Sequence, residues 1–196
     1  MNVLKLALPL AAALSLSACG VNSIPTKEEG VKSAWGEVEN QYQRRADLIP
    51  NLVATVKGFA QQEQDVLVGV TEARAKATQT TLKAEDLSDP AKVAAYNDAQ
   101  SGLSSALSRL MVVVEKYPEL KSDQNFLALQ SQLEGTENRI SIARRDYNEA
   151  VRTYNVEIRT FPAIIVAKTI YGAEPKEPFA ATTANAETAP PVSFAK

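Results

Sequence analysis

Apolar residues recur at alternating intervals of three and four along most of this chain, which is the spacing of one face of an α-helix. The first series keeps its phase from residue 31 to residue 77, and only Arg45 and Glu63 place a charge on it. A seven-residue repeat of this length is typical of helices that pack with a shallow left-handed crossing. Because "TKEE" at 26–29 fits a capping box, we expect one long helix from Thr26 to about residue 77. Its apolar and small members are Val31, Trp35, Val38, Tyr42, Ile49, Leu52, Val56, Phe59, Val66, Val70, Ala73 and Ala77.

Pro50 lies inside this predicted helix. Proline has no N–H, so it removes the hydrogen bond to the Ala46 carbonyl and costs about 3 kcal/mol in a helix interior. Ile49 and Leu52 nevertheless stay in register on either side of it. We therefore predict a single helix that bends between Ala46 and Pro50, rather than a hinge.

A second helical pattern follows a polar connector at residues 78–89. Asp89 directly precedes Pro90, which predicts an N-cap followed by proline at the first helical position. This helix should run from Pro90 until the Tyr117-Pro118 pair stops it. Its apolar face consists of Val93, Tyr96, Leu103, Leu107, Leu110, Val114 and Tyr117.

A third helical pattern begins after the turn at 118–121, with Ser122 as the expected N-cap, and ends at Phe161-Pro162. Its apolar face consists of Phe126, Leu129, Leu133, Ile140, Tyr147, Val151, Tyr154, Ile158 and Phe161. Four glycines within the helical patterns lower helix propensity. They suggest either close approach of neighbouring helices or a groove for a partner helix. These glycines are Gly58, Gly69, Gly102 and Gly135.

The C-terminal part of the chain changes character twice. Residues 163–172 are apolar and few, which predicts a capping helix or an extended arm over the bundle. The tail at 180–196 is small, polar and proline-bearing, and we expect that it does not order on its own. No alternation of period two appears in the sequence. We predict an all-α fold over residues 26–179: an elongated antiparallel bundle of three long helices plus a short C-terminal helix or arm, four-helix-bundle-like.

The N-terminus has the pattern of a targeting segment. Lys5 is followed by an apolar run that is too short for a membrane span of about 20 residues and matches a signal-peptide core. The run ends on "LSAC" and resembles the lipobox of bacterial lipoproteins. We therefore predict removal of residues 1–18, a lipid anchor on Cys19 and a tether at 19–25. Gly20, in place of an aspartate, resembles the sorting pattern for an outer membrane, facing the periplasm, in a host with two membranes.

The composition of the chain argues against several classes of function. The formal net charge is −2, or about −3 once Lys5 is removed, and this balance gives no field for binding nucleic acid. Histidine is absent and Cys19 is the only cysteine, so the chain has no internal disulfide, no Cys/His zinc site and no imidazole base. We predict that the protein is not an enzyme and uses no cofactor or metal. An enzyme with paired carboxylates is the weakest alternative.

Several separated motifs resemble those of the LemA family, in the expected order. They are "QYQRRADLIPNLVATVKGFA" at 41–60, "TEARAKA" at 71–77, "YPELKSDQNFLALQSQLEGTENRISIARRDYNEAVRTYN" at 117–155 and "FP" at 161–162. The resemblance implies an antiparallel bundle held at a membrane by its N-terminus, with no established enzymatic activity. It also implies envelope proteases or stress-related membrane proteins as partners. Many family members carry an N-terminal transmembrane helix, where this sequence has a lipobox.

The first candidate site contains Arg45. It lies on the apolar seam, and Glu134 and Glu137 lie near or on the facing stripe of the third helix. A buried guanidinium needs a paired carboxylate, so we predict an internal polar network that fixes helix register. Tyr147 and Tyr154 are expected to add buried rings with paired hydroxyls. The alternatives are an anion or lipid-headgroup clamp at the arginines and an aromatic ligand box at the tyrosines.

Arg44, Asn51 and Lys57 are the candidates for contact with a partner. We predict a membrane-anchored envelope protein that acts as a non-enzymatic adaptor or scaffold for another envelope protein. The alternative is a structural envelope protein that self-associates through the apolar seam, accepting a fourth helix from a second copy if the C-terminal arm leaves the seam open.

Overall fold

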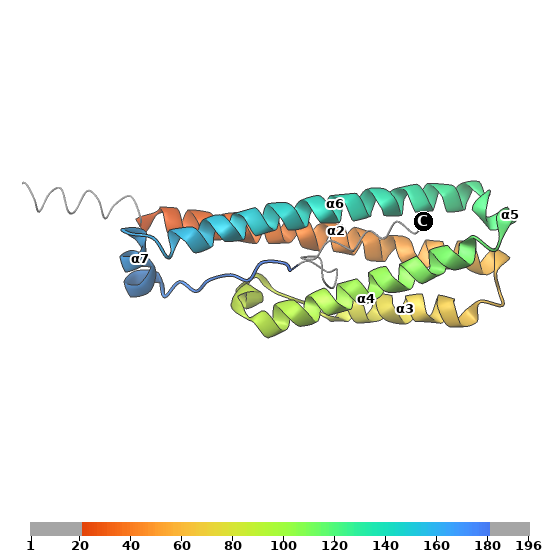
Figure 1. Cartoon of the computed structure of the whole chain (residues 1–196), viewed down its shortest axis with the longest axis horizontal. Helices are drawn as coiled ribbons and strands as arrows, with labels where there is room; N and C mark the ends of the chain where they lie inside the picture. The colour runs from red at the N-terminus through yellow and green to blue at the C-terminus, as the bar shows by residue number, and fades with distance from the viewer. Residues whose placement is uncertain (1–20, 181–196) are drawn as a thin grey trace, which may run out of the picture.

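Two long helices, α2 (Ser23–Phe59) and α6 (Gln124–Glu157), lie antiparallel along the whole length of the molecule in the computed structural model, which describes residues 21–180 (Figure 1). Helices α3 (Gln64–Gln79) and α4 (Pro90–Val114) pack against this pair over the half of the rod farther from the start of α2. The described residues form helices, turns and extended connections without strands. The structure thus confirms the predicted all-helical class.

The first helical pattern is not one helix, as the sequence predicts, but two. α2 ends at Phe59, the chain turns over residues 60–63, and α3 runs back antiparallel to α2. The Ala60 N–H caps α2 by donating to the Val56 carbonyl at 2.9 Å. Both helices bury their stripes in the same core, so the apolar pattern continues in phase across the turn and does not mark it. Glu63, one of the two charges on the pattern, is the residue that precedes α3.

Helix boundaries agree with the predicted caps at one point and differ at others. The Asp89 carboxylate accepts hydrogen bonds from Ala91 N at 2.9 Å and Lys92 N at 3.3 Å, with Pro90 as the first helical residue, which confirms that cap. The cap of α6 is Asp123, which accepts from Phe126 N at 2.9 Å, and not Ser122. The Ser122 hydroxyl instead donates to a carbonyl of the short helix α5 (Pro118–Lys121).

The expected capping box at Thr26 is also wrong. Its hydroxyl donates to the Asn22 carbonyl at 2.7 Å from within the first turn of a helix that already begins at Ser23. Residues 23–25 therefore belong to α2, although the sequence assigns them to a tether. The predicted leader 1–18, Cys19 and the tail 181–196 lie outside the described residues.

The end of the rod at which α2 begins is closed by the segment after α6. α6 ends at Glu157, and Phe161, predicted to close its apolar face, is 77% exposed because the chain has already turned away from the core. α7 (Ala163–Val166) and the single π turn η2 (Ala167–Tyr171) follow, so the predicted capping helix is present. Gly172 then takes a positive φ of 55°, which suits glycine, and starts an extended arm, residues 173–180.

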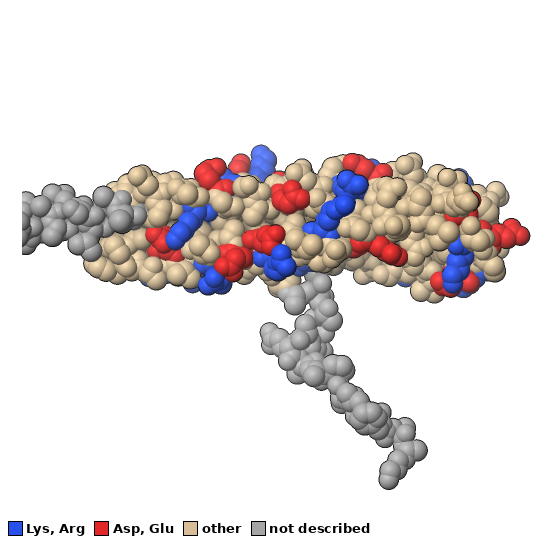
Figure 2. Space-filling view, turned by 90° about the horizontal axis from the view of Figure 1, so that it is seen from above, with Lys and Arg blue, Asp and Glu red and all other residues tan. Residues whose placement is uncertain are grey.

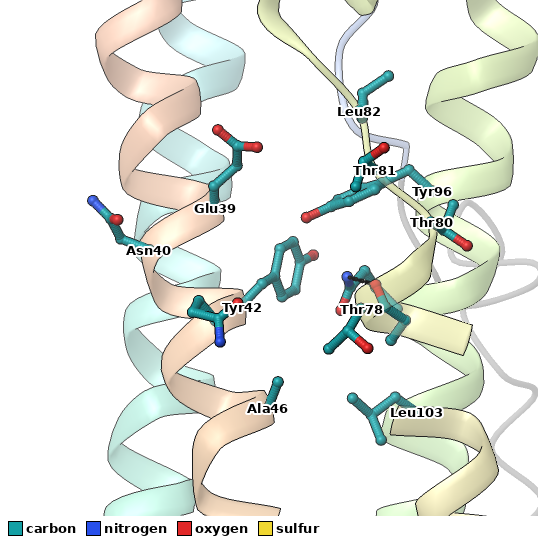
Figure 3. Close-up of a pocket in the computed structure, with 13 residues that line it drawn as sticks. Glu39, Asn40, Tyr42, Ala46, Thr78, Thr80, Thr81, Leu82, Tyr96 and Leu103 are labelled. Atoms are coloured by element: carbon teal, nitrogen blue, oxygen red, sulfur yellow. Dashed lines mark hydrogen bonds between the residues drawn. The ribbon is translucent and has the colours of Figure 1, made fainter. Parts of the chain in front are cut away.

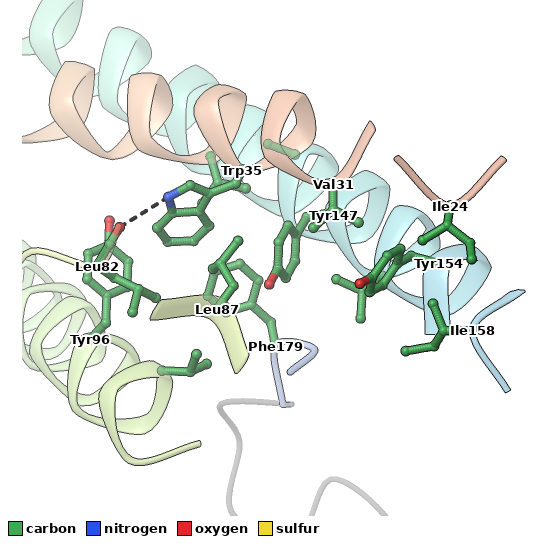
Figure 4. Packing of buried hydrophobic residues seen from close by; sticks show 14 of the residues in the cluster. Ile24, Val31, Trp35, Leu82, Leu87, Tyr96, Tyr147, Tyr154, Ile158 and Phe179 are labelled. Carbon is green, nitrogen blue, oxygen red and sulfur yellow. Dashed lines mark hydrogen bonds between the residues drawn. The ribbon is translucent and has the colours of Figure 1, made fainter. Parts of the chain in front are cut away.

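The arm and the 3₁₀ turn η1 (Ala84–Ser88) cover the half of the α2/α6 pair that α3 and α4 leave open (Figure 1). Trp35 is the centre of this packing: its ring lies 5.3 Å from that of Tyr96, 5.7 Å from that of Tyr147 and 5.9 Å from that of Phe179 (Figure 4). The Trp35 Nε1–H donates to the Leu82 carbonyl at 3.1 Å. A second cluster of buried residues joins α2, α3, α4 and the start of α6.

Within residues 21–180, none of the helices combines the length and the apolar character needed to cross a bilayer.

Candidate functional site

Arg45 is the centre of a buried polar network where α2, α4 and α6 meet. The residue is 1% exposed. Nη1 donates to Ser104 Oγ at 2.9 Å and to Glu137 Oε1 at 3.0 Å, and Nη2 donates to Gln100 Oε1 at 2.6 Å and to the Gln100 carbonyl at 3.3 Å. The guanidinium carbon also lies 5.0 Å from the centre of the Tyr42 ring. Three helices are thereby tied to one side chain.

The two glutamates on α6 lie differently. Glu137 pairs with Arg45, and its side chain is still 42% exposed, so the ion pair spans the surface and the interior. Glu134 is exposed and accepts from Gln130 Nε2 at 2.9 Å on its own helix. The structure therefore brings only one of the two candidate carboxylates to Arg45.

The α4 side of this network, Gln100 and Ser104, is not among the residues predicted from the sequence. Gln100 is 7% exposed and fills the gap in the apolar series of α4 between Tyr96 and Leu103. A polar residue at a seam position was therefore the available signal. Because a buried amide needs partners, a seam glutamine facing a seam arginine indicates a hydrogen-bonded pair.

Two polar pockets flank the network. One, of about 300 Å³, is lined by Arg45, Glu137, Arg144 and serine hydroxyls of α4 and α6. The other, of about 320 Å³, lies between α2, α4 and the connector after α3, and Figure 3 shows Tyr42 and Tyr96 extending into it. These two rings lie 5.7 Å apart. The walls of the two pockets offer hydroxyl, amide and guanidinium groups. In the part of the chain that the structure describes, no cluster of side chains suits a metal ion.

Burial dominates the titration of the groups around the second pocket. It raises the pKa of the Tyr42 hydroxyl, and the nearby positive charges of Arg144 and Arg45 offset part of that rise. Burial likewise raises the pKa of Tyr96 and of the Glu39 carboxyl. Both tyrosines are therefore neutral at physiological pH and serve as hydrogen-bonding and packing groups.

The hydrogen bond that Pro50 removes from α2 is replaced by one from another helix, a contact that the sequence did not indicate. α2 passes through Pro50 as one helix, as predicted, and the Ala46 carbonyl loses its helical donor there. Arg74 of α3 supplies the replacement, because its Nε–H donates to the Ala46 carbonyl at 2.7 Å. The antiparallel return of α3 is what places this guanidinium beside the gap. The predicted bend of α2 stays a prediction.

Tyr147 and Tyr154 lie on α6 between Glu137 and the C-terminal end of that helix. Both are buried, and burial raises the pKa of Tyr154 to about 12 and raises that of Tyr147 further. The Tyr147 hydroxyl donates to the Glu177 carbonyl of the arm at 2.9 Å. The Lys176 ammonium lies 5.9 Å from the Tyr154 ring centre. The tyrosine stripe thus faces the chain's own arm, and these residues do not join the Arg45 network.

Two asparagines fasten the arm to this stripe. Asn148 donates to the Phe179 carbonyl at 3.1 Å and accepts from Phe179 N at 2.8 Å. Asn155, one heptad further along α6, makes the same pair of bonds with the backbone of Lys176, at 2.8 and 2.9 Å. The repeated Tyr-Asn pairs are therefore a docking stripe for the arm, in which the ring packs and the amide holds the backbone.

The other candidate residues lie on the surface. Arg44, Asn51 and Lys57 are exposed along α2, and their contact with a partner stays a prediction. Four helical glycines are not points of close approach, because a Cβ added at any of them would meet no atom within 4 Å. These glycines are Gly58, Gly69, Gly102 and Gly135.

A larger groove separates α4 from α6 at the end of the rod away from α7. It has a volume of about 820 Å³. Apolar side chains line its floor, with Met111 half-buried and Leu127 48% exposed. Charged residues, among them the paired Glu115 and Lys121, stand at its rim. Elsewhere, Figure 2 shows positive and negative side chains interspersed over the visible face.

These features define a class: an all-helical rod whose interior is fastened by buried hydrogen bonds and an ion pair and whose one end carries an apolar groove. The chain belongs to the LemA family, whose sequence model matches residues 34–194 and therefore includes the Arg45 network.

Curated relatives share part of this sequence. Magnetosome proteins MamQ 1 and MamQ 2 of Paramagnetospirillum magneticum are each 30% identical to it over 157 residues, and MamQ of Magnetospirillum gryphiswaldense is 27% identical over the same length. Each match covers 72% of this chain and 58% of the relative. The chain thus spans less than two thirds of the length of these relatives.

Proposed function

We propose that this protein is a membrane-anchored protein of the cell envelope, held by a lipid on Cys19, and that it acts as a non-enzymatic helical adaptor. In this proposal another envelope protein binds in the α4/α6 groove. If the host has two membranes, Gly20 favours the outer one, with the rod in the periplasm. Membership of the LemA family supports membrane association, because the family resemblance implies a bundle held at a membrane by its N-terminus. The match to the MamQ relatives supports a shared helical region only, and we assign no magnetosome role to this chain.

The groove is the observation that carries the adaptor role. The α2/α6 seam is filled by α3, α4 and the arm, so the surface that the self-association alternative needs is covered. Between α4 and α6 the packing stays open around Met111 and Leu127. A groove with an apolar floor and charged rims is the form that receives an amphipathic helix.

The test is photo-cross-linking in cells. A photoreactive amino acid replaces Leu127 in the groove, and a matched control replaces Val68 of α3, which is 53% exposed and lies outside the groove. We expect one recurrent partner protein attached at position 127 and not at position 68. An adduct between two copies from position 127 alone would favour the self-associating alternative. The same mixture of adducts from both positions would contradict a specific groove.

A further inference from the structure

Exposed apolar side chains gather at one corner of the molecule. Among the described residues, four of the ten exposed large apolar side chains fall within residues 161–171. They are Phe161 at 77%, Ile165 at 55%, Ile170 at 64% and Tyr171 at 42%, and we call this set the α7 tip. Apolar side chains that are exposed singly are normal on a protein surface, whereas a contiguous set marks a contact with another molecule or a membrane.

The α7 tip lies at the end of the rod where α2 begins (Figure 1). The Tyr171 hydroxyl donates to the Val21 carbonyl at 2.9 Å, which ties the tip to the start of the described chain. Cys19, the predicted site of the lipid, precedes Val21 by only two residues in the sequence. A lipid on Cys19 therefore brings the α7 tip to the surface of the bilayer.

The charges around the tip suit lipid headgroups. Arg159 and Lys168, next to the apolar residues in sequence, are both exposed. The nearest carboxylate on α6, Glu157, is already engaged by Lys27, which leaves Glu174 as an exposed acid that follows the tip. Apolar side chains flanked by basic residues are typical of surfaces that insert into the interface between headgroups and acyl chains.

We propose that the α7 tip rests in the headgroup region of the membrane, with Phe161, Ile165 and Ile170 reaching the upper acyl chains. The lipid on Cys19 then acts together with an inserted protein surface, so the rod stands on the membrane at a fixed end. The α4/α6 groove is thereby presented away from the bilayer. This inference depends on the proposed lipid anchor.

The test is fluorescence quenching by lipids that carry bromine near the headgroup end of their acyl chains. Lipidated full-length protein is reconstituted into phosphatidylethanolamine and phosphatidylglycerol vesicles with and without the brominated lipid. The variants are Phe161→Trp and Ile170→Trp, so one poorly folded variant does not decide the result. Val112→Trp, at a 66% exposed position two residues before the C-terminal end of α4, is the matched control. The native Trp35 is 1% exposed and serves as the unquenched background.

We expect the indoles introduced at positions 161 and 170 to be quenched and the one at position 112 to be unaffected. Vesicle flotation measured on the same samples separates the two proposals. Protein that floats with the vesicles but shows no quenching at 161 and 170 would support the lipid anchor and contradict insertion of the α7 tip. Equal quenching at all three positions also overturns it, because the rod then lies flat. Wild-type protein that fails to float overturns the anchor, and the tip with it.

Discussion

Replacing Arg74 by methionine should destabilise the protein, because it leaves the backbone carbonyl of Ala46, on another helix, without a hydrogen-bond donor. Pro50 leaves the Ala46 carbonyl without its helical donor, and Ala46 is only 3% exposed. Arg74 Nε–H takes that place at 2.7 Å. A hydrogen bond from a charged donor contributes about 1.5–3 kcal/mol, and an unpaired buried carbonyl costs a similar amount. Because Arg74 is only half-buried, we expect Arg74→Met to lower the free energy of unfolding by about 2 kcal/mol.

The same change should matter little when residue 50 has an N–H. In a Pro50→Ala background the helix supplies its own donor to Ala46, so Arg74→Met should cost only about 0.5 kcal/mol. The coupling between the two sites is then about 1.5 kcal/mol, a size typical of residues that share a partner.

Urea unfolding followed by circular dichroism on the four proteins of this cycle measures the coupling. Arg139→Met, at an exposed position, is the control and should change stability by less than about 0.5 kcal/mol. An equal cost of Arg74→Met in both backgrounds would refute the idea that Arg74 replaces the missing helical donor.

Three further predictions use the same unfolding assay. Arg45→Met should lower the free energy of unfolding by about 3 kcal/mol, because it removes four hydrogen bonds and leaves buried acceptors unpaired. Glu137→Gln should lower it by only about 1 kcal/mol, because that side chain is 42% exposed. Equal losses for the two variants would contradict the burial argument. Gly135→Ala should stabilise by up to about 1 kcal/mol, because an added Cβ meets no atom within 4 Å, and a loss of stability would show a hidden contact. Hydrogen bonds from Lys27 and Ser23 lower the pKa of Glu157 below 4.5, so its contribution is present above that pH and is lost as pH falls through the lowered pKa. Glu157→Gln should therefore reduce stability at neutral pH, and the difference from wild type should shrink in acid; a difference independent of pH would argue against the ionised bond.

The fold class followed from the apolar periodicity because each long helix buries one continuous stripe. The turn between α2 and α3 did not follow from it, because Phe59 and Val66 stay in phase while the chain reverses between them. The helix ends depended on which of two adjacent polar residues makes the cap. Asp123 rather than Ser122 caps α6, a choice that rests on geometry and not on residue type.

The α2 side of the candidate site was predictable from the sequence, because it carries an isolated charge. Arg45 stood out because a cation interrupts an apolar stripe, and the structure buries it beside Glu137. Gln100 was overlooked because a neutral amide at a seam position looks like a tolerated substitution. The contact of Arg74 with Ala46 depends on the reversal of α3, so no local pattern in the sequence could indicate it.

Mass spectrometry of the N-terminal peptide of protein purified from its own membranes is the most direct test of the proposed function. The proposal predicts a mature chain that starts at Cys19 and carries acyl groups, and a Cys19→Ser variant that lacks them and no longer fractionates with the membrane. An unmodified Cys19 in a chain that still begins at Met1, or firm membrane binding by the serine variant, would contradict a lipid-anchored protein.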